Sequence, residues 1–99
     1  MRKMKLIDQK IYDDFPWVTV MFECTQEWLP LIHGAFSEIE NYCDENKIDY
    51  PCITQVKEKY NTLRIYLGSY EEKYEEDYEN IDKIIKKYQL ASVKYSKHN

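Results

Sequence analysis

The sequence predicts an α+β fold in which two helices cover one face of a three-stranded, mainly antiparallel sheet, in the order β-α-β-β-α. Two segments carry apolar residues at spacings of three and four, which indicates helices. A short segment between them alternates apolar and polar residues, as a half-buried strand does. With 99 residues, the chain has the length of one domain.

The composition excludes several classes of protein. Ten tyrosines raise the aromatic fraction to 15%, so wholesale disorder is excluded. The net charge is −4, so we expect no direct binding to nucleic acid or to an anionic membrane. The longest apolar run is about four residues, whereas a membrane span needs about 20. The first residues also lack the apolar core of a signal peptide, and we expect a cytoplasmic protein.

Three widely spaced cysteines, Cys24, Cys43 and Cys52, fit a reducing compartment, because secreted small domains usually carry an even set. We expect them to be free thiols, mostly buried. No CxxC pair or Cys/His cluster is present, so we expect no metal site and no cofactor. His33 and His98 are isolated in the sequence, and no nucleophile–base motif accompanies them. We therefore expect no catalytic residue.

The N-terminal part is predicted in two pieces. Residues 1–15 are polar, with few apolar positions, and we expect an arm or a weak strand. Residues 17–24 are rich in β-branched and aromatic types, and they predict the first strand of a domain over 16–95. Residues 96–99 are expected to fray.

A first helix is predicted over about 27–46. Thr25 can cap its start, and Pro30 falls near the first turn, where a missing N–H costs least. Pro51 forbids continuation beyond the end. The residues at helical spacing that form its apolar stripe are Leu29, Ile32, Phe36, Ile39 and Cys43.

Two strands, 52–60 and 63–67, are predicted to form an antiparallel hairpin around a turn at Asn61-Thr62. Alternation places the apolar residues of both strands on one face, toward the helices. The expected core residues of this hairpin are Val56, Tyr60, Leu63, Ile65 and Leu67.

The second helix is predicted over about 70–90. Ser69 and Glu72 have the spacing of a capping box at its start. Acidic residues dominate its first half and lysines its second half, which suits the helix dipole. The apolar stripe consists of Tyr70, Tyr74, Tyr78, Ile81, Ile85 and Tyr88.

Residues 55–66, which read QVKEKYNTLRIY, resemble the QVKEKFGGLRFY motif of a family of small phage and bacterial proteins. Residues 28–32, WLPLI, are similar to the GW-x-x-L-[LI] helix start of that family. The resemblance extends over about residues 18–90. Asn61-Thr62 replaces the family's Gly-Gly turn, and the cysteine pair that often follows in the family is absent. The resemblance implies a phage or mobile-element setting and brings no catalytic activity with it.

The strongest candidate site is the face of the hairpin that points away from the helices. Lys57, Lys59, Arg64 and Tyr66 share that face, and such a group can bind a phosphate or a partner's carboxylate. The alternative is a solvated face with cross-strand charge pairing. Trp28 is a further binding candidate if its edge is exposed, and otherwise a core anchor.

Two features near this face leave alternatives open. Glu58 falls on the inward side, so it is either an acid/base group, a partner of Arg64 or a lysine, or a residue at the sheet edge. The start of the second helix carries a run of carboxylates that can mimic nucleic acid or simply face water. That acidic surface consists of Glu71, Glu72, Glu75, Glu76 and Glu79, with Asp77 and Asp82 nearby.

These features favour a small binding protein over an enzyme. The preferred hypothesis is a phage-type accessory protein that binds and inhibits a host or competitor protein by occlusion, in the host cytoplasm. The alternatives are an acidic nucleic-acid mimic that uses residues 69–82, and a protein that sequesters a nucleotide or small phosphate ligand through Lys57, Lys59 and Arg64.

Overall fold

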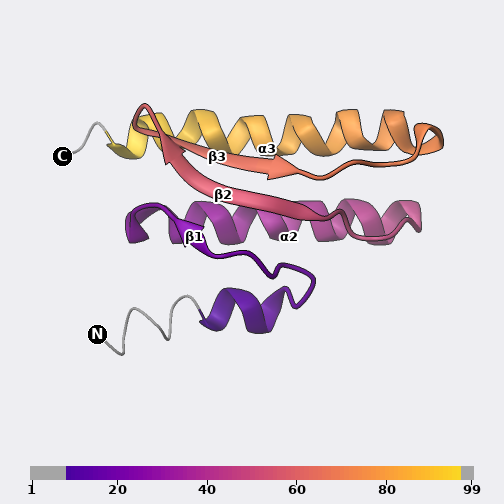
Figure 1. Cartoon of the computed structure of the whole chain (residues 1–99), viewed down its shortest axis with the longest axis horizontal. Helices are drawn as coiled ribbons and strands as arrows, with labels where there is room; N and C mark the ends of the chain where they lie inside the picture. The colour runs from indigo at the N-terminus through magenta and orange to yellow at the C-terminus, as the bar shows by residue number, and fades with distance from the viewer. Residues whose placement is uncertain (1–8, 97–99) are drawn as a thin grey trace.

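The computed structural model describes the backbone of residues 9–96 and the side chains of residues 9–94. The predicted α+β class is confirmed: helices and a three-stranded sheet pack as two layers (Figure 1). The hairpin crosses in front of two long helices that lie side by side. The elements are β1 (Phe22–Glu23), η1 (Gln26–Trp28), α2 (Leu29–Asn46), β2 (Ile53–Lys59), β3 (Thr62–Leu67), η2 (Glu72–Tyr74) and α3 (Glu75–Ser96).

The sheet is mixed, with strand order β1-β2-β3. β2 and β3 are antiparallel, as predicted, but β1 runs parallel to β2. The parallel pairing follows from the connection. α2 carries the chain back to the end of the sheet at which β1 starts, so β2 runs in the same direction as β1. The strand predicted over 17–24 is reduced to the two residues of β1.

The N-terminal segment differs from the predicted arm or weak strand. Residues 9–14 are helical, and Ile11, Phe15 and Val18 are buried in the core. The rings of Phe15, Trp17 and Phe22 pack around Phe36 of α2. Before β1, aromatic packing rather than strand pairing therefore holds this segment. Residues 1–8 of that prediction lie outside the described residues.

The helix α2 matches its prediction. The Thr25 hydroxyl accepts a hydrogen bond from the Glu27 N–H at the start of η1, and Pro30 lies in the first turn of α2. Lys47 ends the helix in a left-handed conformation, with φ of 56°. All five residues of the predicted stripe are buried: Leu29, Ile32, Phe36, Ile39 and Cys43.

The hairpin turn lies one residue earlier than predicted. Tyr60 and Asn61 both have positive φ, and Lys59 pairs with Thr62, which is a two-residue turn of the kind that matches strand twist. Tyr60 is consequently 83% exposed, so its predicted place in the core is wrong.

An irregularity between Ile53 and Gln55 interrupts the pairing of β2 with β3. Strict alternation cannot bury two residues three positions apart, yet Ile53 and Val56 are both buried. A bulge that adds one residue solves this conflict, because it returns the second side chain to the inner face.

α3 begins later and ends later than predicted, at Glu75 and Ser96. The capping box does not form, because Glu71 precedes the first helical turn and Ser69 lies outside it. The helix therefore includes the first residue of the predicted frayed tail, and residues 97–99 lie outside the described part of the chain.

α2 and α3 approach each other closely at Gly34. A Cβ added there would lie 2.9 Å from Tyr88 Cε1, so a larger residue would force the ring to move. The Tyr88 hydroxyl donates to Glu38, which also accepts from Lys87 Nζ at 2.7 Å. At this approach the Tyr88 ring and the Glu38 carboxylate join the two helices.

The edge of β3 is closed by side chains of α3. The Leu63 N–H donates to Ser92 Oγ at 2.9 Å, and the Ile65 N–H donates to Gln89 Oε1 at 3.2 Å. These outward amides would otherwise form an open sheet edge. Ser92 is fully buried, and its hydroxyl donates in turn to the Gln89 carbonyl.

Eight of the nine residues that the two stripes and the hairpin pattern place most firmly in the core are buried, and Leu67 is half-buried. The eight are Ile32, Phe36, Ile39, Val56, Leu63, Ile65, Ile81 and Ile85. Within residues 9–96, no helix has both the length and the apolar character needed to span a bilayer.

Candidate binding surfaces

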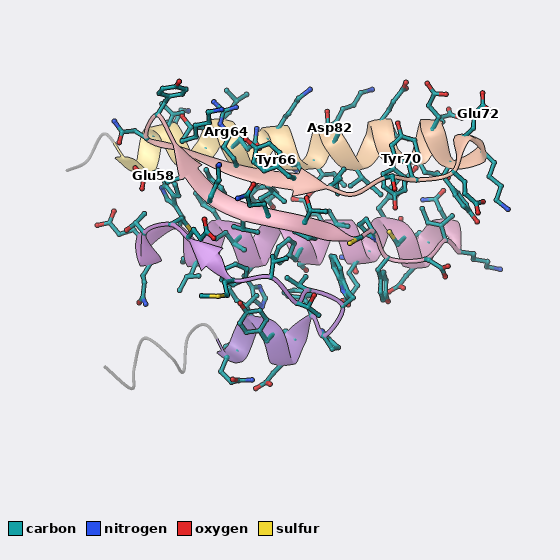
Figure 2. The ribbon with its side chains drawn as sticks, in the orientation of Figure 1. Glu58, Arg64, Tyr66, Tyr70, Glu72 and Asp82 are labelled. Atoms are coloured by element: carbon teal, nitrogen blue, oxygen red, sulfur yellow. The ribbon has the colours of Figure 1, made fainter. Side chains whose placement is uncertain are left out.

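The open face of the hairpin, defined here by Lys57, Lys59, Arg64 and Tyr66, is arranged by the β2–β3 register. Lys57 lies directly opposite Arg64, and Gln55 lies opposite Tyr66. Lys59 is exposed, Tyr66 is 36% exposed, and Lys57 and Arg64 are half-buried. Figure 2 shows Arg64 and Tyr66 along β3, with Glu58 near the turn end of the hairpin. The structure therefore brings these four predicted residues together on one face.

Arg64 and Lys57 form a like-charge pair across the two strands. Like charges directly opposite each other destabilise a sheet. Among residues 9–94, no ion pair involves either side chain, and Arg64 Nε is buried without a hydrogen-bond partner. The predicted alternative of cross-strand charge pairing is therefore wrong at this position. An anionic group placed here would relieve the repulsion and satisfy the guanidinium.

A concave region beside Arg64 extends the open face toward α3. It has a volume of about 400 Å³ and lies between β3 and the outer side of the helix. Its apolar part comes from Leu90 and Val93, and its charged part from Arg64 and Lys86. The sequence pattern does not predict this connection, because it does not show which helix residues lie beside β3.

The positions of Glu58 and Trp28 in the structure decide between the roles predicted for each residue. Glu58 is exposed and lies opposite Leu63, not Arg64, so it is neither a buried acid nor a partner of that arginine. Trp28 is only 1% exposed, and its indole is part of the core. Its assignment as a binding residue is therefore wrong, because η1 turns the ring inward.

The acidic surface at the start of α3 is exposed as predicted. Glu71, Glu72, Glu75, Glu76 and Glu79 all face solvent. Asp77 is different: its carboxylate accepts a hydrogen bond from the Tyr42 hydroxyl at 2.7 Å and joins α3 to α2. Tyr70 stacks on Tyr78 at a ring distance of 4.2 Å, so these tyrosines partly cover each other. Figure 2 shows Glu72 at the opposite end of the molecule from Arg64.

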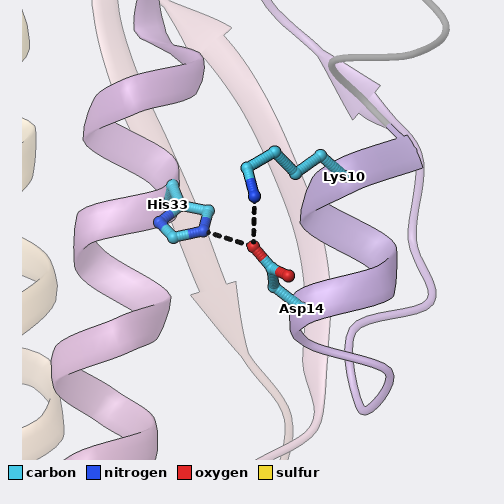
Figure 3. Close-up of polar contacts among 3 residues, drawn as sticks. All are labelled: Lys10, Asp14 and His33. Carbon is cyan, nitrogen blue, oxygen red and sulfur yellow. Dashed lines mark hydrogen bonds and ion pairs between the residues drawn. The ribbon is translucent and has the colours of Figure 1, made fainter.

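A further polar cluster joins the N-terminal helix to α2 (Figure 3). Asp14 accepts from His33 Nε2 at 2.8 Å and lies 3.3 Å from Lys10 Nζ. The hydrogen bond from His33, followed by that from Lys10, lowers the pKa of Asp14 below its usual value. His33 is isolated in the sequence, and its partner Asp14 lies on a segment for which the sequence predicted an arm or a weak strand instead of a helix.

The cysteines are free thiols in three different environments. Cys43 is buried, and burial raises the pKa of its thiol to about 11, so it is a poor nucleophile at neutral pH. Cys24 is half-buried, and Cys52 is exposed, so the expectation that the thiols are mostly buried is wrong. Within the described residues, no group of three or more His, Cys, Asp or Glu side chains is placed to hold a metal ion.

Comparisons of the chain with protein-family models, curated proteins and solved structures each found no match.

Proposed function

We propose that this chain is a small non-catalytic binding protein that docks an acidic surface of a partner protein on its open face. Inhibition of that partner would follow from occlusion of its surface. The resemblance at residues 55–66 suggests the setting: a phage or mobile-element product that acts on a host or competitor protein in the host cytoplasm.

The observation that carries this proposal is the unneutralised Lys57–Arg64 pair. Two cations lie opposite each other, and the buried guanidinium Nε has no hydrogen-bond partner among residues 9–94. Both features favour an incoming carboxylate. Arginine and tyrosine are enriched among hot-spot residues, and Tyr66 lies next to Arg64 along the same face. Lysines near the rim mainly set the association rate and its salt dependence.

The test begins with a partner recovered by affinity capture from expressing cells, whose binding is then measured with purified proteins. Arg64→Ala should weaken binding by about 2 kcal/mol or more, which is about thirtyfold. Circular dichroism and thermal melting should show that the variant stays folded, because Arg64 lies outside the apolar core.

The control variant discharges the acidic surface by changing Glu75, Glu76 and Glu79 to Gln. If the triple variant loses binding and Arg64→Ala retains it, the open face is not the binding surface. The acidic surface then takes its place, as a mimic of nucleic acid that binds a basic partner. The observation that favours this second candidate is that five glutamates lie exposed over little more than two helical turns.

A phosphate ligand is distinguished by thermal stability. Inorganic phosphate or a nucleotide that binds Lys57, Lys59 and Arg64 should raise the melting temperature of the wild type and not that of Arg64→Ala. A docking protein without such a ligand should show no shift with either compound.

A further inference from the structure

The solvent-exposed side of α3 is divided into two halves of opposite charge. The outward positions of the first half are all glutamates, and the outward positions of the second half are mainly lysines around Leu90. The change of sign falls between Asp82 and Lys83. The first set is Glu75, Glu76 and Glu79, and the second is Lys83, Lys86, Leu90 and Lys94.

The basic half is also hollowed. Leu90 is 71% exposed and separates the region beside β3 from a second concave region of about 540 Å³. Lysines rim this second region, and Leu90 and Ala91 supply its apolar part. Such a hollow fits the aliphatic part of a glutamate side chain whose carboxylate then reaches a lysine.

We propose that α3 pairs with α3 of a second copy of this chain, antiparallel about a two-fold axis near Asp82 and Lys83. Residues equidistant from that axis then face each other. Glu79 lies opposite Lys86 of the partner subunit, and Asp82 lies opposite Lys83 of the partner subunit. A parallel arrangement would instead place like charges together, so charge complementarity selects one orientation. The two-fold axis repeats each contact and closes the assembly as a dimer.

Contacts within the chain set the strength of this dimer. Lys86 Nζ lies 2.8 Å from Asp82, and Lys87 is held by Glu38, so Lys87 is not available for the partner. Formation of the dimer therefore replaces the exposed Lys86–Asp82 ion pair within each chain by ion pairs between the two chains. Exposed ion pairs are individually weak and are screened by salt. A dimer that forms at high protein concentration and dissociates at high ionic strength is the expected behaviour.

The test is sedimentation equilibrium of the full chain at low salt and at about 1 M salt, where the Debye length falls to about 3 Å. Two charge-reversed variants are compared: Glu75→Lys with Glu79→Lys, and Lys83→Glu with Lys86→Glu. Each variant alone should remain monomeric where the wild type is dimeric. An equimolar mixture of the two should form a mixed dimer, because their outer faces are then opposite in sign.

A matched control places the same charge change elsewhere, as Glu23→Lys with Glu45→Lys, both exposed and outside α3. This variant should dimerise as the wild type does. A wild type that is monomeric at every concentration, a dimer insensitive to the α3 reversals, or a mixture that does not associate would each overturn the proposal. Association with a different acidic protein alone would also overturn it. Lys86 also lines the concave region beside Arg64, whereas Glu75 and Glu79 do not. The Glu75→Lys with Glu79→Lys variant therefore tests the dimer without changing the open face.

Discussion

The two sides of the β2–β3 hairpin differ in how completely their groups are satisfied. On the inner side, Val56, Leu63 and Ile65 are buried, and α3 supplies acceptors for the outward amides of β3. On the open side, Lys57 and Arg64 lie opposite each other, and among residues 9–94 neither forms an ion pair. The contacts that stabilise the fold therefore lie on the inner side of the strands, and the open side contributes charged groups that do not pack in the core.

The largest effect that would test this comparison comes from the inner side. Leu63→Ala should lower the free energy of unfolding by about 2–5 kcal/mol, because it removes a fully buried side chain and leaves a cavity. Urea denaturation measures the change. Lys59→Ala, on the open side, is the control and should stay within about 0.5 kcal/mol. Similar losses in both variants would remove the distinction between the two sides.

Closure of the β3 edge is expected to be the next largest effect. Ser92→Ala removes the acceptor of the Leu63 N–H and leaves that amide buried and unpaired. The cost should be about 1–3 kcal/mol in chemical denaturation. Ser69→Ala is a useful comparison, because Ser69 is exposed and lies outside the helix, and its loss should have little effect. A larger cost at Ser69 than at Ser92 would contradict the observed start of α3.

A smaller effect concerns pH. Hydrogen bonds from Lys87 and then Tyr88 hold the pKa of Glu38 below its usual value of 4.5. The carboxylate therefore stabilises the fold above about pH 4.5, and this contribution is lost as pH falls through the lower folded pKa. The gap in unfolding free energy between wild type and Glu38→Gln should be about 1 kcal/mol or less at neutral pH, because the pair is exposed.

The measurement is urea denaturation of both proteins from neutral pH to about pH 3, where the carboxylate is protonated in the unfolded chain. The gap should narrow as the solution is acidified. Glu45→Gln, at the exposed end of α2, is the control. A gap that widened on acidification would show that the contacts to Lys87 and Tyr88 do not favour the charged carboxylate.

The sequence predicted the inner side of the hairpin and α2 well. Apolar residues that recur with a period of 2 or of 3.6 are compatible with few structures other than a strand or a helix. The prediction failed over most of 17–24, where Trp17 packs on Phe36 without strand pairing and only Phe22 and Glu23 pair with β2. Composition alone cannot separate these two causes of burial. A signal for the N-terminal helix was present: Ile11 and Phe15 are four residues apart and both are buried.

The sequence predicted which residues share the open face, but it did not predict which of them lie opposite each other. Alternation placed Lys57, Arg64 and Tyr66 on one face. A turn at Asn61-Thr62, however, would have set Lys59 opposite Arg64, whereas the turn at Tyr60-Asn61 sets Lys57 there. The register depends on one residue of turn length, and a tyrosine in a left-handed turn position gives no sequence signal for it.

The parallel pairing of β1 has a consequence for the order of folding. β2 and β3 are joined by a two-residue turn, whereas β1 meets β2 only after the whole of α2 has been laid down between them. Distant pairings form slowly, because loop entropy is lost before contacts compensate for it. The kinetic φ-value is the fraction of a variant's loss of stability that already appears in its folding rate. We therefore expect kinetic φ-values near zero for variants at Phe22 and well above zero for variants at Leu63. During synthesis the N-terminal segment leaves the ribosome first, yet it would remain undocked until the hairpin has formed.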